Sequence, residues 1–274
     1  MALAHFNPLT SEQITSRAPS VFSDGKQSHL SDRYAFVPTS DVVDFMEQNG
    51  WFPIETVEVK TRKETNKGYQ RHMVRFRHPE LSFNNIEGDD NFIDILLTNS
   101  HNGKSSFTFQ LGVFRLICSN GLVVKTADMG TARVRHLFKG SEGEFNVMFT
   151  EVLNKLVNQI PQTITSIKQM QTTEMSEKQI AEFALNAATA RFKEKIKDID
   201  HQQLIKELVK AERQQDQGNS VWLVFNRLQE KLLKGNYSYT NTKHKQRKAR
   251  SLNNIAQQTK LNSELFDMAY EYVV

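Results

Sequence analysis

The sequence predicts an α+β protein: an N-terminal, mostly antiparallel sheet with a short helix, followed by a C-terminal set of amphipathic helices. Between about residue 56 and residue 138, several runs alternate apolar and polar side chains, which is typical of strands. From about residue 141, apolar residues instead recur at helical spacings. Because the strands precede the helices and do not alternate with them, we expect segregated layers.

The expected organisation has three parts. Residues 1–30 are polar, contain the helix-discouraging stretch APS and show no sustained periodicity, so we expect a mobile N-terminal arm. A β-rich core region is expected over residues 31–140. A helical region is expected over residues 141–274, packed on that core or extending from it.

The first predicted element of the body is a short amphipathic helix. Thr39 or Ser40 can cap it, the apolar stripe around Phe45 can bury one face, and Gly50 is a plausible stop.

A β-hairpin is predicted next, from the alternation over residues 56–62 and 70–78 around the polar turn 64–68. One face is expected to pack, and its members are Val57, Val59, Thr61, His72, Val74 and Phe76. The other face is expected to be basic, and its members are Lys60, Arg62, Arg71, Arg75 and Arg77.

Two further strands are predicted over residues 92–98 and 105–119, joined by a turn at Asn102-Gly103. The second is apolar on both faces and so belongs in the middle of a sheet. Residues 122–125 and 132–138 can complete that sheet. Cys118 lies before the turn signal Asn120-Gly121, and we interpret it as a buried strand residue in preference to a nucleophile.

Helices are predicted over residues 144–160, 176–196, 198–215, 220–236 and 263–274. Ser176 and Gln179 have the spacing of a capping box, and Pro161 separates the first two helices. Ser220 is expected to cap the fourth helix, and Gly235 to end it.

Composition limits the classes of function. The chain has 274 residues, 38% of them hydrophobic, and 18 Phe, which suffices for a large core. Its single cysteine allows no internal disulfide and no cysteine-rich zinc cage. Because no long apolar run and no signal peptide is evident, we expect a cytoplasmic protein without membrane association.

Signals for catalysis are weak, so an enzyme is the minority interpretation, and no catalytic residue, metal or cofactor is assigned. The sequence has no HExxH, GxSxG or glycine-rich phosphate motif. Asp89, Asp90 and Asp94 could hold a divalent cation as in a metal-dependent nuclease, although a solvated turn is the commoner outcome for such a cluster.

Basic clusters are the better signal, although charge runs are usually just solvated faces. Formal net charge is only +4, yet residues 60–78 and 243–250 are both strongly basic. Along the hairpin, alternate residues would present cations about 6 to 7 Å apart, near the phosphate repeat of an extended single strand, and Tyr69 could stack on a base. The candidate nucleic-acid-binding residues are Lys60, Arg62, Lys63, Lys67, Tyr69, Arg71, Arg75, Arg77, Lys243, Lys245, Arg247, Lys248 and Arg250.

Three phrases carry a resemblance to a known family: SDRYAFVPTSDVVDFMEQNGW, FTFQLGVFRLICSNGLVV and SVWLVFNRLQEKLLKG. From about residue 30 to the C-terminus, the chain resembles the uncharacterised phage/plasmid-like protein family, the domain of unknown function nine-three-two. The family's Cys-Asn-Gly phrase matches Cys118, Asn120 and Gly121. The resemblance implies a bacterial or phage protein of a mobile element acting in the cytoplasm, and it carries over no catalytic residue.

The leading hypothesis is therefore a non-enzymatic nucleic-acid-binding protein of a phage, prophage or plasmid. It would bind single-stranded DNA in replication, recombination or strand annealing, with homo-oligomer formation suggested by architectural analogy alone. The alternative is a protein-interaction factor of a mobile element, such as a counter-defence protein with a host or phage protein as partner. In that case the acidic residues 87–94 and the long helices would supply the contact surface.

Overall fold

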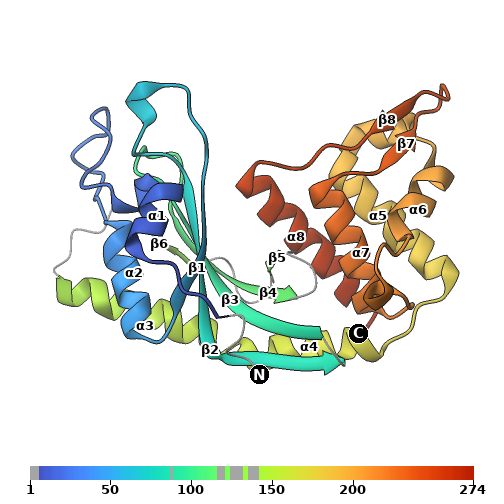
Figure 1. Ribbon diagram of the computed structural model, residues 1–274, viewed down its shortest axis with the longest axis horizontal. Coiled ribbons are helices and arrows are strands. Elements are labelled where there is room, and N and C mark those ends of the chain that lie inside the picture. The colour runs from blue at the N-terminus through green and yellow to red at the C-terminus, as the bar shows by residue number, and fades with distance from the viewer. Residues whose placement is uncertain (1–5, 87–88, 116–120, 124–131, 135–141) are drawn as a thin grey trace. The chain divides into compact units, whose positions relative to one another are not determined.

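The computed structural model describes residues 6–86, 89–115, 121–123, 132–134 and 142–274. It divides into two compact units, one formed by Met1–Ser119 with Ala127–Ile160 and the other by Asn120–Thr126 with Pro161–Val274 (Figure 1). Strands dominate the first unit and helices the second, which confirms the predicted α+β class. None of the helices in the described part of the chain combines the length and the hydropathy needed to cross a bilayer.

The first unit is built around an antiparallel sheet with the order β1–β2–β3–β4, and β6 pairs with β4. Its strands are β1 (Phe52–Glu58), β2 (His72–Ile86), β3 (Asp89–Asn99), β4 (Phe107–Arg115) and β6 (Ala132–Val134). Its helices are α1 (Ser11–Arg17), α2 (Thr39–Gln48) and α3 (Glu142–Val157), with short 3-10 turns η2 (Pro19–Phe22) and η3 (Glu64–Asn66).

One face of this sheet forms the core of the first unit. Phe107 and Phe109 of β4 are buried there and lie 6.0 and 5.4 Å from the ring of Phe149 in α3. Phe45 of α2 contacts the same ring at 6.0 Å, so α2 and α3 cover this face together (Figure 1). The inward direction predicted for β2 is confirmed, because His72, Val74 and Phe76 are all fully buried. The turn at Gly103 is also confirmed, with φ +72°.

The face predicted for β1 is wrong. Thr56 pairs with Val74 and is buried, whereas Val57 and Val59 are 37% and 41% exposed. The register shifts between Pro53 and Glu55, and such an irregularity, which single-strand alternation does not reveal, changes the face on which each side chain lies. β1 also ends at Glu58, so the predicted basic residues at 60 and 62 lie in a loop and not on a strand.

The described part of residues 1–30 differs from the mobile arm that was expected. Thr10 caps α1 through a capping box, and Ile14 and Val21 are buried. The hydroxyl of Ser20 also donates to Gln70 at 3.1 Å. Ala18 is the third buried apolar residue of this segment. Three apolar side chains in a short segment give no sustained periodicity, so the sequence pattern did not indicate that the segment packs.

The second unit is mainly helical. Its helices are α4 (Ile160–Thr172, whose first residue falls in the first unit), α5 (Glu177–Phe192), α6 (His201–Val209), α7 (Val221–Lys234) and α8 (Ile255–Tyr270). Short 3-10 turns η4 (Lys193–Asp198) and η5 (Gln214–Asp216) connect them, and strands β5 (Gly121–Val123), β7 (Ser238–Thr240) and β8 (Gln246–Lys248) complete the unit. The capping box at Ser176 and the cap at Ser220 are both confirmed.

Two elements of this unit were not predicted. Pro161 was interpreted as a break, yet it lies in the first turn of α4, where the missing amide proton costs no helical hydrogen bond. The basic stretch after α7 was expected only as a connection, and it forms the antiparallel β7–β8 hairpin.

Candidate nucleic-acid interface

Two of the predicted phosphate-binding residues are instead neutralised inside the first unit. Arg77 is 7% exposed, and its Nε and Nη2 each donate to a carboxylate oxygen of Asp94 at 2.8 Å. Its guanidinium also lies 3.8 Å from the centre of the Phe92 ring. Arg75 pairs with Glu55 at 2.6 Å and with Asp94 at 3.4 Å, and burial lowers its pKa against the opposing effect of these carboxylates. These arginines stabilise the sheet and do not face a polyanion.

The remaining candidates of the first unit lie in or beside the loop between β1 and β2. Lys60, Arg62 and Lys63 are exposed, and Lys67 pairs with the exposed Glu64 at 2.7 Å. Arg71 donates to the carbonyl of Lys104 at 3.2 Å, and Tyr69 is half-buried. The loop therefore presents cations, but not the alternating stripe along a strand that the sequence predicted.

The proposed acidic metal site is not supported by its described member. Asp94 is fully buried and its two oxygens are engaged by arginines, so it is not free to bind a cation. The side chains of Asp89 and Asp90, and all of Cys118, lie outside what the structure describes. Among the described residues, no three His, Cys, Asp or Glu side chains form a group that could hold a metal ion.

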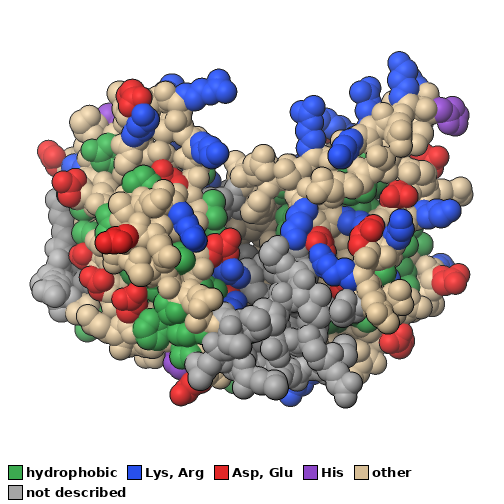
Figure 2. Space-filling model, viewed as in Figure 1, with side chains coloured by type: hydrophobic (Ala, Val, Ile, Leu, Met, Phe, Trp, Pro, Cys, Tyr) green, Lys and Arg blue, Asp and Glu red, His purple; other side chains and the backbone are tan. Residues whose placement is uncertain are grey.

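The second basic cluster forms a β-hairpin in the second unit. Ser238, Tyr239 and Thr240 of β7 pair with Lys248, Arg247 and Gln246 of β8. Five basic side chains are exposed on β8 and beside it, and Figure 2 shows Lys and Arg side chains gathered over this hairpin. The five, which we call the hairpin cations, are Lys243, Lys245, Arg247, Lys248 and Arg250.

The neighbouring elements fix this hairpin in place. The side chain of Gln203 in α6 accepts from the Thr240 amide at 3.0 Å and donates to the Ser238 carbonyl at 3.3 Å. At the other end, the Ala249 amide donates to the Tyr237 carbonyl at 2.8 Å. Because β7 is anchored to α6 and β8 is paired with β7, the exposed cations stand on a defined surface and not on an unstructured tail.

A basic groove of about 1010 Å³ lies beside the hairpin. Four cations and no carboxylate are among its lining side chains: Lys234, Arg247, Lys248 and Arg250. The rest of the lining is neutral and includes Asn236, Gln246 and Asn253. A groove of this composition has a positive potential, which attracts anions such as phosphate.

A second hollow of about 630 Å³ adjoins the basic groove, since Lys234, Asn236 and Gln246 line both. We call it the charge-balanced pocket, because four carboxylates and four cations line it. The carboxylates are those of Glu207, Glu212, Asp216 and Glu230, and the cations are Lys210, Arg227, Lys231 and Lys234.

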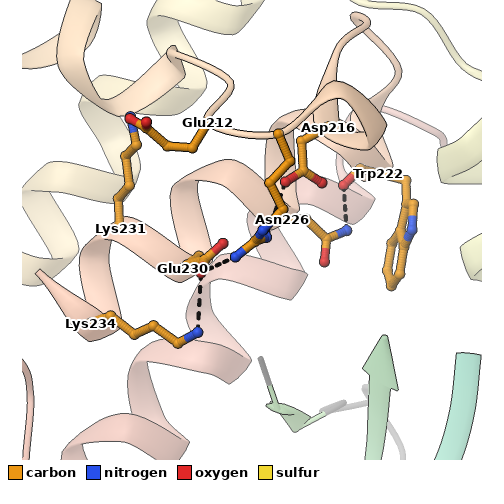
Figure 3. Close-up of polar contacts among 8 residues, drawn as sticks. Glu212, Asp216, Trp222, Asn226, Glu230, Lys231 and Lys234 are labelled. Atoms are coloured by element: carbon orange, nitrogen blue, oxygen red, sulfur yellow. Dashed lines mark hydrogen bonds and ion pairs between the residues drawn. The ribbon is translucent and has the colours of Figure 1, made fainter. Parts of the chain in front are cut away.

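Ion pairs hold most of these charges in fixed positions. Lys234 lies 3.1 Å from the carboxylate of Glu230, and Lys231 lies 3.2 Å from that of Glu212 (Figure 3). Arg213 lies 2.6 Å from Glu230. Although burial raises the pKa of Glu230, the hydrogen bonds and charges of its two cationic partners together hold it below its usual value. The carboxylate of Glu230 is therefore ionised at neutral pH.

The lack of acids that accompanies the basic run extends well beyond the run itself. No Asp or Glu occurs between Glu230 and Glu264, a stretch that includes the end of α7, the whole hairpin and the start of α8. A solvent-exposed protein surface normally mixes the two signs of charge. The absence of acids on both sides of the basic run indicates a cationic surface more strongly than the run alone.

The fold and this surface define an α+β protein with a helical unit that carries a basic hairpin and groove. The chain belongs to the family described as Domain of unknown function (DUF932), whose model matches residues 26–261. It is 30% identical over 269 residues to the UPF0380 protein YafZ of Escherichia coli strain K12, covering 96% of this chain and 90% of that protein. It has the same identity and coverage with the UPF0380 protein YfjQ of the same strain. No solved structure matches.

Proposed function

We propose that this protein binds nucleic acid through the phosphate backbone. Its proposed ligand is single-stranded DNA, and it has no catalytic centre of its own. The observation that carries the proposal is the cluster of five exposed hairpin cations on an anchored hairpin, beside a groove lined by cations and no carboxylate. Each lysine or arginine that neutralises a phosphate releases a condensed counterion, which supplies most of the sequence-independent affinity. The family resemblance supports a role on mobile DNA, in replication, recombination or strand annealing.

The hairpin also offers an aromatic side chain. Tyr239 lies directly opposite Arg247 in the register of β7 and β8 and is half-buried. Its ring packs edge-on against Phe192 at 5.3 Å, which fixes its orientation. An aromatic ring beside cations is the usual combination in single-strand grooves, where bases stack while the phosphates are neutralised. Tyr239 thus takes the stacking role that the sequence pattern suggested for Tyr69.

The test is fluorescence anisotropy with a labelled oligothymidine of about 30 nucleotides. We expect that replacing the five hairpin cations by Gln weakens binding at least about 100-fold in low salt, because five phosphate contacts are lost. Replacement of Lys197 and Lys260 by Gln is the control, since both are exposed on the same unit but pair with Glu194 and Glu264. Unchanged affinity in the hairpin variant, or no binding by the unaltered protein, would contradict the proposal.

A third variant measures how much the β1–β2 loop contributes to the affinity for the oligonucleotide. Replacing Lys60, Arg62 and Lys63 by Gln removes exposed cations of the first unit without touching the Arg75 and Arg77 ion pairs. We expect a smaller loss than for the hairpin variant, because these side chains line no described groove.

A further inference from the structure

We infer that the charge-balanced pocket takes an unpaired nucleobase of the strand whose phosphates lie in the basic groove. The inference rests on the proposed function and deepens it, since it names the part of the nucleotide that each hollow recognises. Its basis is the continuity of the two hollows and the difference in their charge.

The two hollows match the two halves of a nucleotide in charge. The basic groove has cations and no carboxylate in its lining, as an anionic phosphate requires. The charge-balanced pocket carries equal numbers of carboxylates and cations, so it offers no net attraction to a phosphate. A neutral group rich in hydrogen-bonding atoms is the suitable occupant, and a nucleobase, which the sugar links to each phosphate, is such a group.

The pocket has the size and the lining for such an occupant. Its volume of about 630 Å³ lies within the range of roughly 300–1,000 Å³ that is typical of small-molecule sites. The polar residues Asn236, Gln246 and Ser238 line it, as do the aromatic residue Tyr237 and Gln203, whose amide already bonds the hairpin backbone. Amides both donate and accept hydrogen bonds, so they can pair with the edge of any base.

One buried cation of the pocket also has spare hydrogen-bonding capacity. Arg227 is 9% exposed and donates to the carbonyl of Gly218 at 2.8 Å, while its buried Nε has no hydrogen-bond partner within the described residues. Burial lowers its pKa, and the negative charge of Asp216 opposes that effect. A buried guanidinium left partly unpaired favours an occupant that brings an acceptor atom.

A base that enters the pocket must be unpaired, so the pocket distinguishes single strands from duplexes. A base within a duplex presents its hydrogen-bonding edge to its partner strand and cannot enter a pocket without leaving the stack. A base of a single strand enters at little cost. The geometry therefore favours single strands over duplexes of the same phosphate content.

An oligonucleotide without bases separates this inference from the proposed function. Two labelled 30-nucleotide strands are compared at the same salt concentration: oligothymidine, and an abasic strand with the same phosphates. We expect the unaltered protein to bind oligothymidine at least about tenfold more tightly than the abasic strand, because the abasic strand brings no base to the pocket or to Tyr239. Equal affinity for the two strands would overturn the inference and leave phosphate binding intact. Failure to bind either strand would overturn both.

A pocket-filling variant locates the effect. Ser238→Trp places a large side chain at a residue that lines the charge-balanced pocket but not the basic groove. We expect this variant to bind the abasic strand normally and to keep only the part of its preference for oligothymidine that stacking on Tyr239 supplies. Thr242→Trp is the matched control, because Thr242 is exposed on the same hairpin and lines neither hollow. A preference in Ser238→Trp as large as that of the unaltered protein, or one reduced equally in both variants, would contradict the assignment.

Discussion

His72 is a fully buried histidine whose ring is held from both sides. Its Nδ1 lies 3.0 Å from the carbonyl of Gln70, and its Nε2 lies 2.9 Å from the hydroxyl of Thr39. The same hydroxyl accepts from the amide of Asn99 at 2.9 Å. Because a carbonyl only accepts, Nδ1 donates to Gln70, and in the neutral ring Nε2 accepts the proton of Thr39.

This arrangement makes stability depend on pH. Burial lowers the pKa of His72 to about 4, against the smaller opposing effect of the Gln70 carbonyl. Below about pH 6.5 the unfolded chain therefore binds a proton on His72 that the folded chain does not bind. The free energy of unfolding is highest above that pH and falls as the pH drops towards 4. Between pH 7 and pH 5 we expect His72 to account for a loss of ~2 kcal/mol in the free energy of unfolding.

Urea unfolding at the two pH values measures this loss. His72→Gln has no ring to protonate, and its free energy of unfolding is expected to fall by ~2 kcal/mol less over the same interval. The exposed His29 gives the matched control, and His29→Gln should follow the unaltered protein. Identical pH profiles for the His72 variant and the unaltered protein would contradict this account.

Asp94 is the buried counterpart of two arginines. Removing its charge in Asp94→Asn leaves Arg77 and Arg75 without a buried partner, so we expect the free energy of unfolding to fall by about 3–5 kcal/mol. Glu55→Gln is the control, because the side chain of Glu55 is 43% exposed and its loss leaves Arg75 a carboxylate partner. The control should cost less than about 1 kcal/mol, and equal losses from chemical denaturation would refute the difference in burial.

The sequence predicted the direction of the Arg75 and Arg77 side chains but not their role, because that role depends on a carboxylate from another strand. Alternation along β2 indicates that Arg75 and Arg77 lie on the face opposite Val74, as the structure confirms. Their carboxylate lies 17 positions from Arg77, on another strand, and is brought there by the β2–β3 register. Local spacing cannot reveal such a pair.

At the scale of elements, Gly235 connects α7 to the hairpin. Its φ is +71°, and a Cβ there would lie 2.7 Å from the carbonyl oxygen of Ala249. This close approach brings the end of α7 to the chain leaving β8. The glycine therefore serves both as a helix end and as a packing site for the hairpin.

Gly235→Ala should consequently destabilise the protein through both backbone strain and a backbone clash. We expect a loss of about 3 kcal/mol in the free energy of unfolding. Gly68→Ala separates the two causes, because Gly68 has φ +81° but a Cβ added to it would have no atom within 4 Å. That control should lose about 1 kcal/mol. Similar losses in both variants, measured by urea unfolding, would show that the approach to Ala249 is unimportant.

Elements with strong local signals could be predicted, and those set by distant contacts could not. The caps at Ser176 and Ser220 depend on nearby residues and were predicted correctly. The cap predicted at Thr39 or Ser40 is wrong, because Pro38 is the N-cap of α2 and no side chain caps that helix. The β7–β8 hairpin lacks apolar alternation, because β8 is exposed on all its residues, and it depends on anchoring by Gln203 of α6. For the same reason the groove beside it could not be predicted, although its cations could.

At the scale of the whole molecule, net charge conceals how the charges are distributed. The chain carries 35 Lys and Arg against 31 Asp and Glu, yet many of these charges are paired. Arg75 and Arg77 are neutralised in the first unit, and the carboxylate of Glu230 pairs with both Arg213 and Lys234 in the second. The hairpin cations differ from these paired charges, because the stretch of chain between Glu230 and Glu264 contains no Asp or Glu.

The salt dependence of oligothymidine binding measures how many phosphates the hairpin cations hold. For a single strand, each phosphate contact contributes about 0.7 to the slope of log affinity against log salt concentration. Replacing Arg247 and Lys248 by Gln should therefore reduce the slope by about 1.4, whereas replacing Lys197 and Lys260, which removes the same charge, should leave it unchanged. A slope that is the same in both double variants, or that falls equally in both, would contradict the claim that the hairpin holds the phosphates.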